Sequence, residues 1–197
     1  MPEPRTPDHT TGPFFPPAFV GQHGNDLTRH NGRAAEGEVL ELAGRVLDRR
    51  GRPAVNVILE LWQADARGVF HDPADPRHAE RDPGFAGWGR TWTDSNGGYR
   101  FRTVRPGSYP ALDAGDWIRP PHLRLLVLGS GLMRPLVTEV FFPGEPLNQT
   151  DRHLSQLEPG RRSRLLAVPA PDESSATGRF GFDVVLSGPH ETPFLDD

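Results

Sequence analysis

One stretch of the chain holds residue types that could bind a metal ion. In SYPALDAGDWIRPPHLRL, residues 108–125, Tyr109 precedes His122 by thirteen residues, and Arg119 lies between them. Residues two apart in a strand project to the same face, so His122 and residue 124 would look into one space. Tyr109 would reach that space if the intervening loop doubles back. A phenolate oxygen together with imidazole nitrogens suits a strongly charged ion such as ferric iron.

The same stretch also argues against a metal. Residue 124 is Arg124, whose guanidinium stays protonated and has no lone pair to donate. The chain has only two tyrosines and no cysteine, and the second tyrosine, Tyr99, alternates with Phe101 as a core strand residue. We therefore predict that this chain alone holds no metal. The structural use expected for Arg124 is an ion pair with a nearby aspartate, Asp113 or Asp116.

The elements that would position these residues are strands. The segments EVLELAGRVLD and PAVNVILELWQ flank the turn-forming DRRGR and predict a hairpin. Further strand candidates are TWTDSNGGYRFRTV, HLRLLVLG, PLVTEVFFP and RFGFDVVLSG, and only residues 150–157 have a helical look. Residues 64–90 form a long loop of a kind that is usually functional or interfacial. The expected fold class is all-β, an antiparallel β-sandwich over residues 38–188 with little helix.

Segments at both ends lie outside the predicted sandwich. Residues 1–37, rich in Pro and Gly, are expected to form an extended N-terminal arm, and residues 189–197 a C-terminal tail. The arm carries Phe14, Phe15 and Phe19, which need burial against the body or against a neighbouring subunit. The sequence does not decide whether these phenylalanines pack against the body or against a neighbouring subunit.

Composition excludes several classes of function. With a formal net charge of -4 and scattered arginines, the chain has no basic tract for nucleic acid. No segment is long and apolar enough to span a membrane, and the first residues lack the pattern of a signal peptide, so we expect a cytoplasmic protein. The absence of cysteine removes disulfides and thiol nucleophiles. No serine lies in a nucleophile elbow, so covalent hydrolysis is not expected.

Motifs spread along the chain resemble one family. GPFF, LELWQADARGVF, DPGFAGWGRTWTDSNGGYRFRTVRPGSYP, IRPPHLRL and EVFFPGE look like the intradiol ring-cleavage dioxygenases, and in particular the protocatechuate 3,4-dioxygenases. The resemblance implies a β-sandwich, and family members hold ferric iron with two tyrosines and two histidines. They use O2 to cleave a catechol ring between its two hydroxyls. On this resemblance, Tyr109 matches one tyrosine ligand, His122 the first histidine ligand, and Arg119 the arginine near the reacting ring.

Two departures from the family's pattern concern the metal. The second histidine position holds Arg124, and the second tyrosine position falls on or beside Arg77 and His78. Protocatechuate 3,4-dioxygenases contain alpha and beta chains, of which the beta chain holds the ferric iron (Fe3+), and this sequence is similar to the alpha type. The resemblance therefore implies that the chain has no catalytic residues of its own and that a beta chain, protocatechuate and O2 are its partners. The remnant of the iron site would be Tyr109, Arg119, His122 and Arg124.

The resemblance also gives the arm a role. Alpha chains carry the pattern T-P-x-x-T-x-G-P, this chain has TPDHTTGP, and the family's segment reaches the cleft beside the partner's iron. Thr10, Gly12 and Pro13 are expected in that substrate cleft, because glycine lets backbone approach a flat ring and proline fixes the path. Ser130 stands where alpha chains have an arginine that attracts the substrate's carboxylate, and Arg134 is its expected substitute.

Two other interpretations remain. TTGPFF by itself is typical of a turn that leads into a hydrophobic anchor. The pattern T-D-x-x-G-x-Y-x-F followed by P-G-x-Y also occurs in transthyretin-like domains, so a non-enzymatic β-sandwich binding or spacer module is the alternative function. The arm motif and the Tyr109 to His122 remnant favour the dioxygenase subunit, since a simple module has no reason to keep either.

Overall fold

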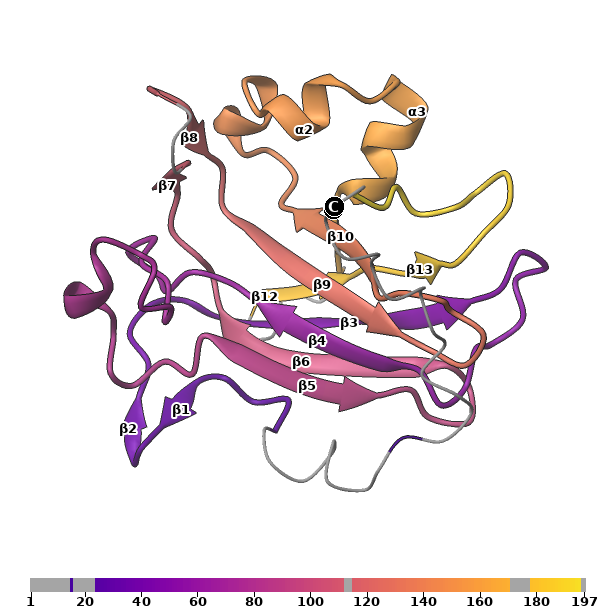
Figure 1. Cartoon of the computed structure of the whole chain (residues 1–197), viewed down its shortest axis with the longest axis horizontal. Helices are drawn as coiled ribbons and strands as arrows, with labels where there is room; N and C mark the ends of the chain where they lie inside the picture. Colours follow the sequence, from indigo (N-terminus) through magenta and orange to yellow (C-terminus); the bar gives the residue numbers. More distant parts are fainter. Residues whose placement is uncertain (1–14, 16–23, 112–114, 171–177, 196–197) are drawn as a thin grey trace, which may run out of the picture.

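Two β-sheets packed face to face form the body of the chain. The structure is a computed structural model and describes residues 15, 24–111, 115–170 and 178–195. Figure 1 shows the strands of both sheets crossing the view, with helices α2 (Arg152–Ser155) and α3 (Pro159–Arg162) together above β10 at the top. The predicted all-β sandwich with little helix is confirmed.

The first sheet is antiparallel and carries the residues singled out above. Its strand order is β10-β9-β4-β5, with β9 paired on one edge to β10 and on the other to β4. Alternate residues of β9 face opposite ways, since Leu123 and Leu125 are fully buried in the core while His122 and Arg124 lie on the outer face. The strands are β4 (Ile58–Trp62), β5 (Trp88–Trp92), β9 (His122–Leu128) and β10 (Leu136–Phe141).

The second sheet is organised around β3. Strand β6 pairs with β3 antiparallel, whereas β12 and β13 pair with it in parallel, so the sandwich is mixed rather than purely antiparallel. Strand β11 completes the edge beyond β12. The strands are β3 (Val39–Leu47), β6 (Gly98–Val104), β11 (Val168–Pro169), β12 (Gly178–Gly181) and β13 (Val184–Val185).

The hairpin predicted from β3 and β4 is wrong. The two strands belong to different sheets, and the only bridge near the turn joins Leu47 to Pro53 in the described residues. The chain crosses between the sheets here, so that Leu59 and Leu61 of β4 meet Leu42 of β3 in one core cluster. Facing sheets bury both apolar faces at once, which a two-stranded ribbon cannot do.

The core between the sheets is apolar and contains the second tyrosine. Tyr99 and Phe101 of β6 are 5% and 0% exposed, which confirms their prediction as core residues. The Tyr99 hydroxyl donates to the carbonyl of Phe182 at 2.6 Å, and burial raises its pKa well above the ordinary value. Each fully buried Leu or Phe side chain contributes about 1.5–3 kcal/mol of transfer free energy.

The described part of the predicted arm packs against the body. Leu27 is fully buried, and a short hairpin of β1 (Arg29–His30) and β2 (Arg33–Ala34) follows it. The ring of Phe15 meets the ring of Trp92 edge-on at 6.2 Å, while Phe14 and Phe19 lie outside the described residues. Toward the C-terminus, Leu195 bridges to Val137 of β10. The domain boundaries at 37 and 189 stay predictions.

The helical segments cover one end of β10. Asp151 caps α2 by accepting a hydrogen bond from the amide of Leu154 at 3.0 Å, in agreement with the helical look of residues 150–157. Leu154, Leu165 and Phe141 form a small second core beneath them. Within the described residues, no helix has the length and apolar character needed to cross a bilayer. The remaining elements are η1 (His78–Glu80), η2 (Pro146–Gln149), η3 (Ser163–Leu165), β7 (Tyr109–Pro110) and β8 (Ile118–Arg119).

Candidate functional site

Tyr109 and His122 meet on the outer face of the first sheet. The loop between them doubles back through the β7 and β8 hairpin, in which Tyr109 pairs with Arg119. The Tyr109 hydroxyl lies 3.2 Å from Nε2 of His122, and the two rings are 5.5 Å apart. The two residue types that the sequence suggested for a metal are therefore together, but they contact each other directly.

The protons of this pair can be assigned from its surroundings. Nδ1 of His122 lies 2.8 Å from the carbonyl of Pro120, which can only accept, so Nδ1 carries the hydrogen. Burial lowers the pKa of His122 to about 4, so the ring is neutral and Nε2 is a bare acceptor. The Tyr109 hydroxyl must then donate to Nε2, and burial raises the pKa of Tyr109 to about 12. The pair is a neutral phenol and a neutral imidazole.

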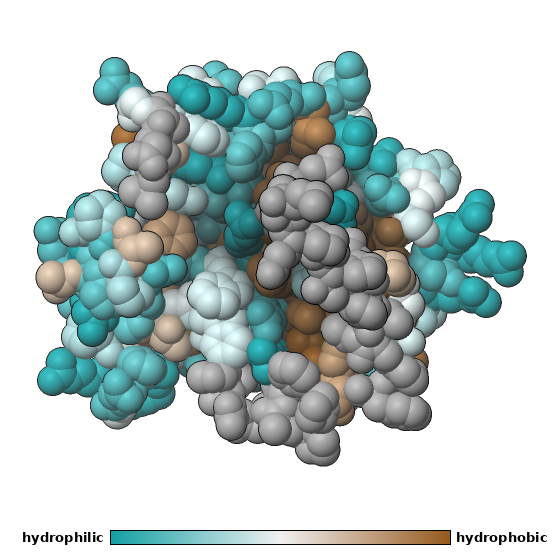
Figure 2. Space-filling model, viewed as in Figure 1, coloured by the Kyte–Doolittle hydropathy of each residue, from teal (hydrophilic) through white to brown (hydrophobic). Residues whose placement is uncertain are grey.

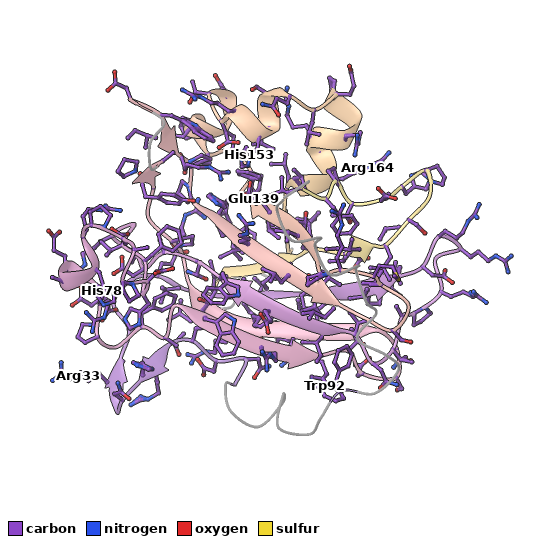
Figure 3. All side chains as sticks on the ribbon, viewed as in Figure 1. Arg33, His78, Trp92, Glu139, His153 and Arg164 are labelled. Carbon is purple, nitrogen blue, oxygen red and sulfur yellow. The ribbon has the colours of Figure 1, made fainter. Side chains whose placement is uncertain are left out.

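A buried network of charges lies beside the pair. Arg119 donates to both carboxylate oxygens of Glu139, at 2.9 Å and 2.7 Å, and its Nε donates to Asp151 at 3.1 Å. His153 donates from Nδ1 to Oε2 of Glu139 at 2.9 Å. Figure 3 shows Glu139 and His153 close together at the end of β10 next to α2. Glu139 and Asp151 are almost fully and fully buried, whereas the His153 side chain is 34% exposed.

The network keeps its members ionised. Burial alone would raise the pKa of Glu139, but hydrogen bonds from His153 and Arg119 outweigh it and hold this pKa far below its ordinary value. Burial would lower the pKa of Arg119, but its hydrogen bonds to Glu139 outweigh that effect and raise it. In the fold the Arg119 guanidinium is bound by carboxylates, and its predicted place near a reacting ring stays a prediction.

Glu139, Asp151 and His153 were missed from the sequence. The sequence did contain a signal for Glu139, because it is an isolated acid inside the apolar strand PLVTEVFFP. It lies on the same strand face as Val137 and Phe141. An unpaired acid at such a position requires a buried cation as its partner. Asp151 stands at the helix N-cap, which accounts for only one of its contacts.

These residues do not fit ferric iron. Glu139 Oε1 is 3.6 Å from His122 Nε2, so a carboxylate already bonded to Arg119 lies against the one imidazole donor. Arg124 stands on the same strand face. Arg77, which the resemblance sets at or beside the family's second tyrosine position, donates from Nη2 to the carbonyl of Gly68 at 2.5 Å. In the described parts of the chain, no group of three or more His, Cys, Asp or Glu could hold a metal ion.

Arg124 occupies a central place on this face. In the sheet register its Cα partners are Glu139 on one side and Trp62 on the other. Of the two aspartates predicted to pair with it, Asp116 is exposed and Asp113 lies outside the described residues. The ion pair of Arg124 with Asp113 or Asp116 stays a prediction.

Two cavities adjoin the Tyr109 and His122 pair. The larger has a volume of about 440 Å³ and lies between β4, β5, the loop after β4 and Tyr109. The smaller, of about 140 Å³, reaches His122 and Arg124. Four residues border both: Trp62, Gln63, Phe70 and Tyr109. Figure 2 shows a brown, apolar strip over the part of the view where β9 and β4 run in Figure 1.

Of the residues predicted for a substrate cleft, the structure describes Ser130 and Arg134, and neither borders these cavities. Thr10, Gly12 and Pro13 lie outside the described residues. Ser130 and Arg134 lie in the turn between β9 and β10, about 20 Å along β9 from His122 at the usual rise per residue. Their assignment to a substrate cleft stays a prediction.

The chain is similar in sequence to known dioxygenases over nearly its whole length. The profile of a family described as Dioxygenase matches residues 10–188. The protocatechuate 3,4-dioxygenase beta chain of Burkholderia cepacia is 36% identical over 92% of this chain and 79% of its own length. The alpha chain from the same organism is 30% identical over 98% of this chain and 97% of its own.

Solved structures agree with the fold. The dioxygenase domain of a dioxygenase carbohydrate-binding protein fusion from Streptomyces sp. SirexAA-E has a TM-score of 0.63 and 30% identity, covering 93% of this chain and 98% of that one. Catechol 1,2-dioxygenase from Acinetobacter sp. ADP1 has the same TM-score of 0.63 at 24% identity, over 99% of this chain and 67% of its own. The fold, the profile match and the relatives together show that this chain belongs to the intradiol ring-cleavage dioxygenase family.

Proposed function

We propose that this chain is the alpha subunit, the one that does not hold iron, of a protocatechuate 3,4-dioxygenase. A beta chain is its partner and supplies the ferric iron. The assembled enzyme opens the ring of 3,4-dihydroxybenzoate between its two hydroxyl-bearing carbons and adds both atoms of O2. The product is 3-carboxy-cis,cis-muconate, an intermediate of aromatic catabolism in the β-ketoadipate pathway.

The donor set around Tyr109 carries this proposal. Sequence identity does not separate the two chain types, because the relatives include a beta chain at 36% and an alpha chain at 30%. The family is iron-dependent, and a chain that holds the iron must present several phenolate and imidazole donors. This chain has a neutral Tyr109 bonded to a neutral His122, with Arg124 and a carboxylate of Glu139 beside them. In this proposal a second chain therefore supplies the phenolate and imidazole donors that hold the iron.

The alternative of a spacer module has less support. The relatives that match the chain over nearly its full length are dioxygenase chains. The family profile that matches it is also described as Dioxygenase. The predicted cleft role of Thr10, Gly12, Pro13, Ser130 and Arg134 is part of the proposal for the assembled enzyme.

The test is to purify the chain alone and together with a beta-type chain. We expect the isolated chain to contain no stoichiometric iron, to be colourless and to consume no O2 with 3,4-dihydroxybenzoate. The complex should contain iron, show the visible tyrosinate-to-iron absorption, and take up one O2 for each substrate molecule.

The matched control is the beta-type chain prepared by itself. Iron-dependent ring cleavage by the isolated alpha-type chain would refute the proposal. So would a failure of the two chains to co-purify when they are expressed together.

A further inference from the structure

The sequence contains two Asn-Gly pairs, and the fold places them in different surroundings. Asn31 precedes Gly32, and Asn96 precedes Gly97. An asparagine followed by glycine is prone to cyclise, because glycine has no side chain to hinder attack of its amide nitrogen on the asparagine side chain. The reaction needs a free amide and a backbone that can turn. Hydrogen bonding and burial therefore decide which of the two pairs can react.

The first pair lies at the exposed tip of the β1 and β2 hairpin. Asn31 and Gly32 form its two-residue loop, with φ of 48° and 78°, which is the pattern of a type I′ turn. Both residues are exposed, and nothing lies within 4 Å of a Cβ atom built on Gly32. In the described parts of the chain, the Gly32 amide donates no hydrogen bond. The nitrogen that would attack is therefore accessible and free.

The second pair is held by the core. Gly97 is buried, its amide donates to the carbonyl of Asp94 at 3.0 Å, and its carbonyl accepts from the amide of Val46 at 2.9 Å. A Cβ atom built on Gly97 would lie only 2.8 Å from the carbonyl oxygen of Val46. The nitrogen next to Asn96 is therefore engaged, and its peptide cannot turn without leaving the core.

Charges near the two pairs act in the same direction as the geometry. The attacking species is the deprotonated amide, which nearby cations stabilise and nearby anions destabilise. Arg29 and Arg33 flank the tip of the first hairpin, and both are exposed. Beside the second pair, the carboxylate of Asp94 accepts from the amides of Asn96 and Gly98, each at 2.8 Å. The first pair is favoured on both grounds.

We propose that Asn31 is a site of spontaneous deamidation in the folded chain and that the fold protects Asn96. The Gly32 nitrogen bonds to Cγ of Asn31, the C–N bond of the side-chain amide breaks, and ammonia leaves with the proton of the Gly32 amide. Water then opens the cyclic imide at either carbonyl, which gives aspartate or isoaspartate. Each event consumes one water and releases one ammonia, and nothing is oxidised or reduced. The proposal does not depend on the proposed function.

The two products would affect the hairpin differently. Aspartate tolerates a positive φ, and its carboxylate would lie between two arginines. Isoaspartate adds a methylene to the main chain, so the pairing of His30 with Arg33 across a two-residue loop would be lost. The His30 ring meets the ring of His71 edge-on at 5.6 Å, and His71 borders the larger cavity. Formation of isoaspartate would therefore disturb a contact between the hairpin and the long loop.

The experiment incubates the purified full chain at mildly alkaline pH, both native and in urea. Peptide mapping by mass spectrometry follows each asparagine, and enzymatic methylation detects isoaspartate. In the native chain we expect Asn31 to convert at least about tenfold faster than Asn96, because the Gly97 amide must first break its hydrogen bond and leave the core. In urea the two should convert at similar rates.

Variants assign the modification to its residue. Asn31→Gln, whose longer side chain cyclises slowly, should remove the acidic form that ion-exchange chromatography separates after native incubation. Asn96→Gln is the matched control and should leave that form unchanged. Thermal melting establishes that each variant is folded, and the mapping of the unaltered chain does not depend on them. Equal native rates at Asn31 and Asn96 would overturn the proposal, as would an Asn31 that converts in urea but stays intact in the native chain.

Discussion

Glu139, an isolated acid in an apolar strand, holds the buried side chain of Arg119 in place. It is 1% exposed and accepts hydrogen bonds from Arg119 and His153. A buried ion of this kind is tolerated only when its partners compensate it, and removal of one partner leaves an uncompensated buried charge. The negative charge of Glu139 therefore keeps Arg119 in place.

Glu139→Gln tests this role, because it keeps the shape of the side chain and removes the charge. We expect a loss of about 3 kcal/mol in the free energy of unfolding, the usual order for breaking a buried ion pair. Asp151 stays bonded to Arg119 and prevents a larger loss. Urea denaturation followed by circular dichroism measures the effect.

The control removes a charge from an exposed ion pair. Arg100 is 67% exposed and lies 3.8 Å from Glu41, so Arg100→Gln should change stability by less than about 0.5 kcal/mol. Equal stability of Glu139→Gln and Arg100→Gln would show that the buried network contributes nothing.

His122 makes stability depend on pH. In the unfolded chain a histidine titrates near 6.5, whereas burial lowers the pKa of His122 in the fold to about 4. Between these values the unfolded chain binds a proton that the folded chain does not, so the free energy of unfolding decreases as pH falls from 6.5 to 4. The shift corresponds to roughly 3 kcal/mol at most.

Urea denaturation at pH 7.5, 6, 5 and 4 measures this decrease. The variant His122→Asn lacks the titrating ring and should show a shallower dependence over the same range. If the free energy of unfolding fell equally with pH in both proteins, the pH dependence would belong to groups other than His122.

At the scale of elements, a close approach of backbones fixes how β3 meets the segment after β12. A Cβ atom built on Gly44 of β3 would lie 1.9 Å from the carbonyl oxygen of Phe182, far inside van der Waals contact. Only glycine allows this approach, and the backbone amide of Phe182 bonds to the carbonyl of Ala43 at 2.9 Å beside it.

Gly44→Ala should therefore force the two backbones apart. We expect a loss of about 1–3 kcal/mol, the usual cost of overpacking, and a lower melting temperature. Gly160 is the matched control, since nothing lies within 4 Å of a Cβ built there. Gly160→Ala in helix α3 should leave the melting temperature unchanged or raise it. If Gly44→Ala melts like Gly160→Ala, the close approach does not constrain the sheet.

Local pattern predicted single strands better than it predicted their partners. Alternation with a period of two is visible in β6 and β9, which each bury one face more than the other, whereas β10 is buried on both faces. The same alternation in β3 and β4 suggested a hairpin, and it could not show that the chain changes sheets between them. The parallel pairing of β12 with β3 joins segments far apart in the chain, which no local pattern encodes.

At the scale of the whole molecule, the sequence predicted the donors of the site but not what surrounds them. Tyr109 and His122 were found because the chain has only two tyrosines and because phenol and imidazole groups can both bind metal ions. Asp151 and His153 belong to a separate segment that reaches Arg119 and Glu139 only through the fold. The prediction that this chain holds no metal rests on Arg124 in the sequence, whereas the compensating side-chain charges beside Tyr109 and His122 became visible only in the structure.

The buried network has a consequence for how the chain matures. Proteins that fold around a metal wait for its supply and collapse when a chelator removes it. Here the positive charge facing Glu139 is supplied by Arg119, which is covalently part of the polypeptide and present as soon as translation ends. We expect the chain to reach its folded form in iron-starved cells, before the beta chain of the proposed complex could acquire its metal.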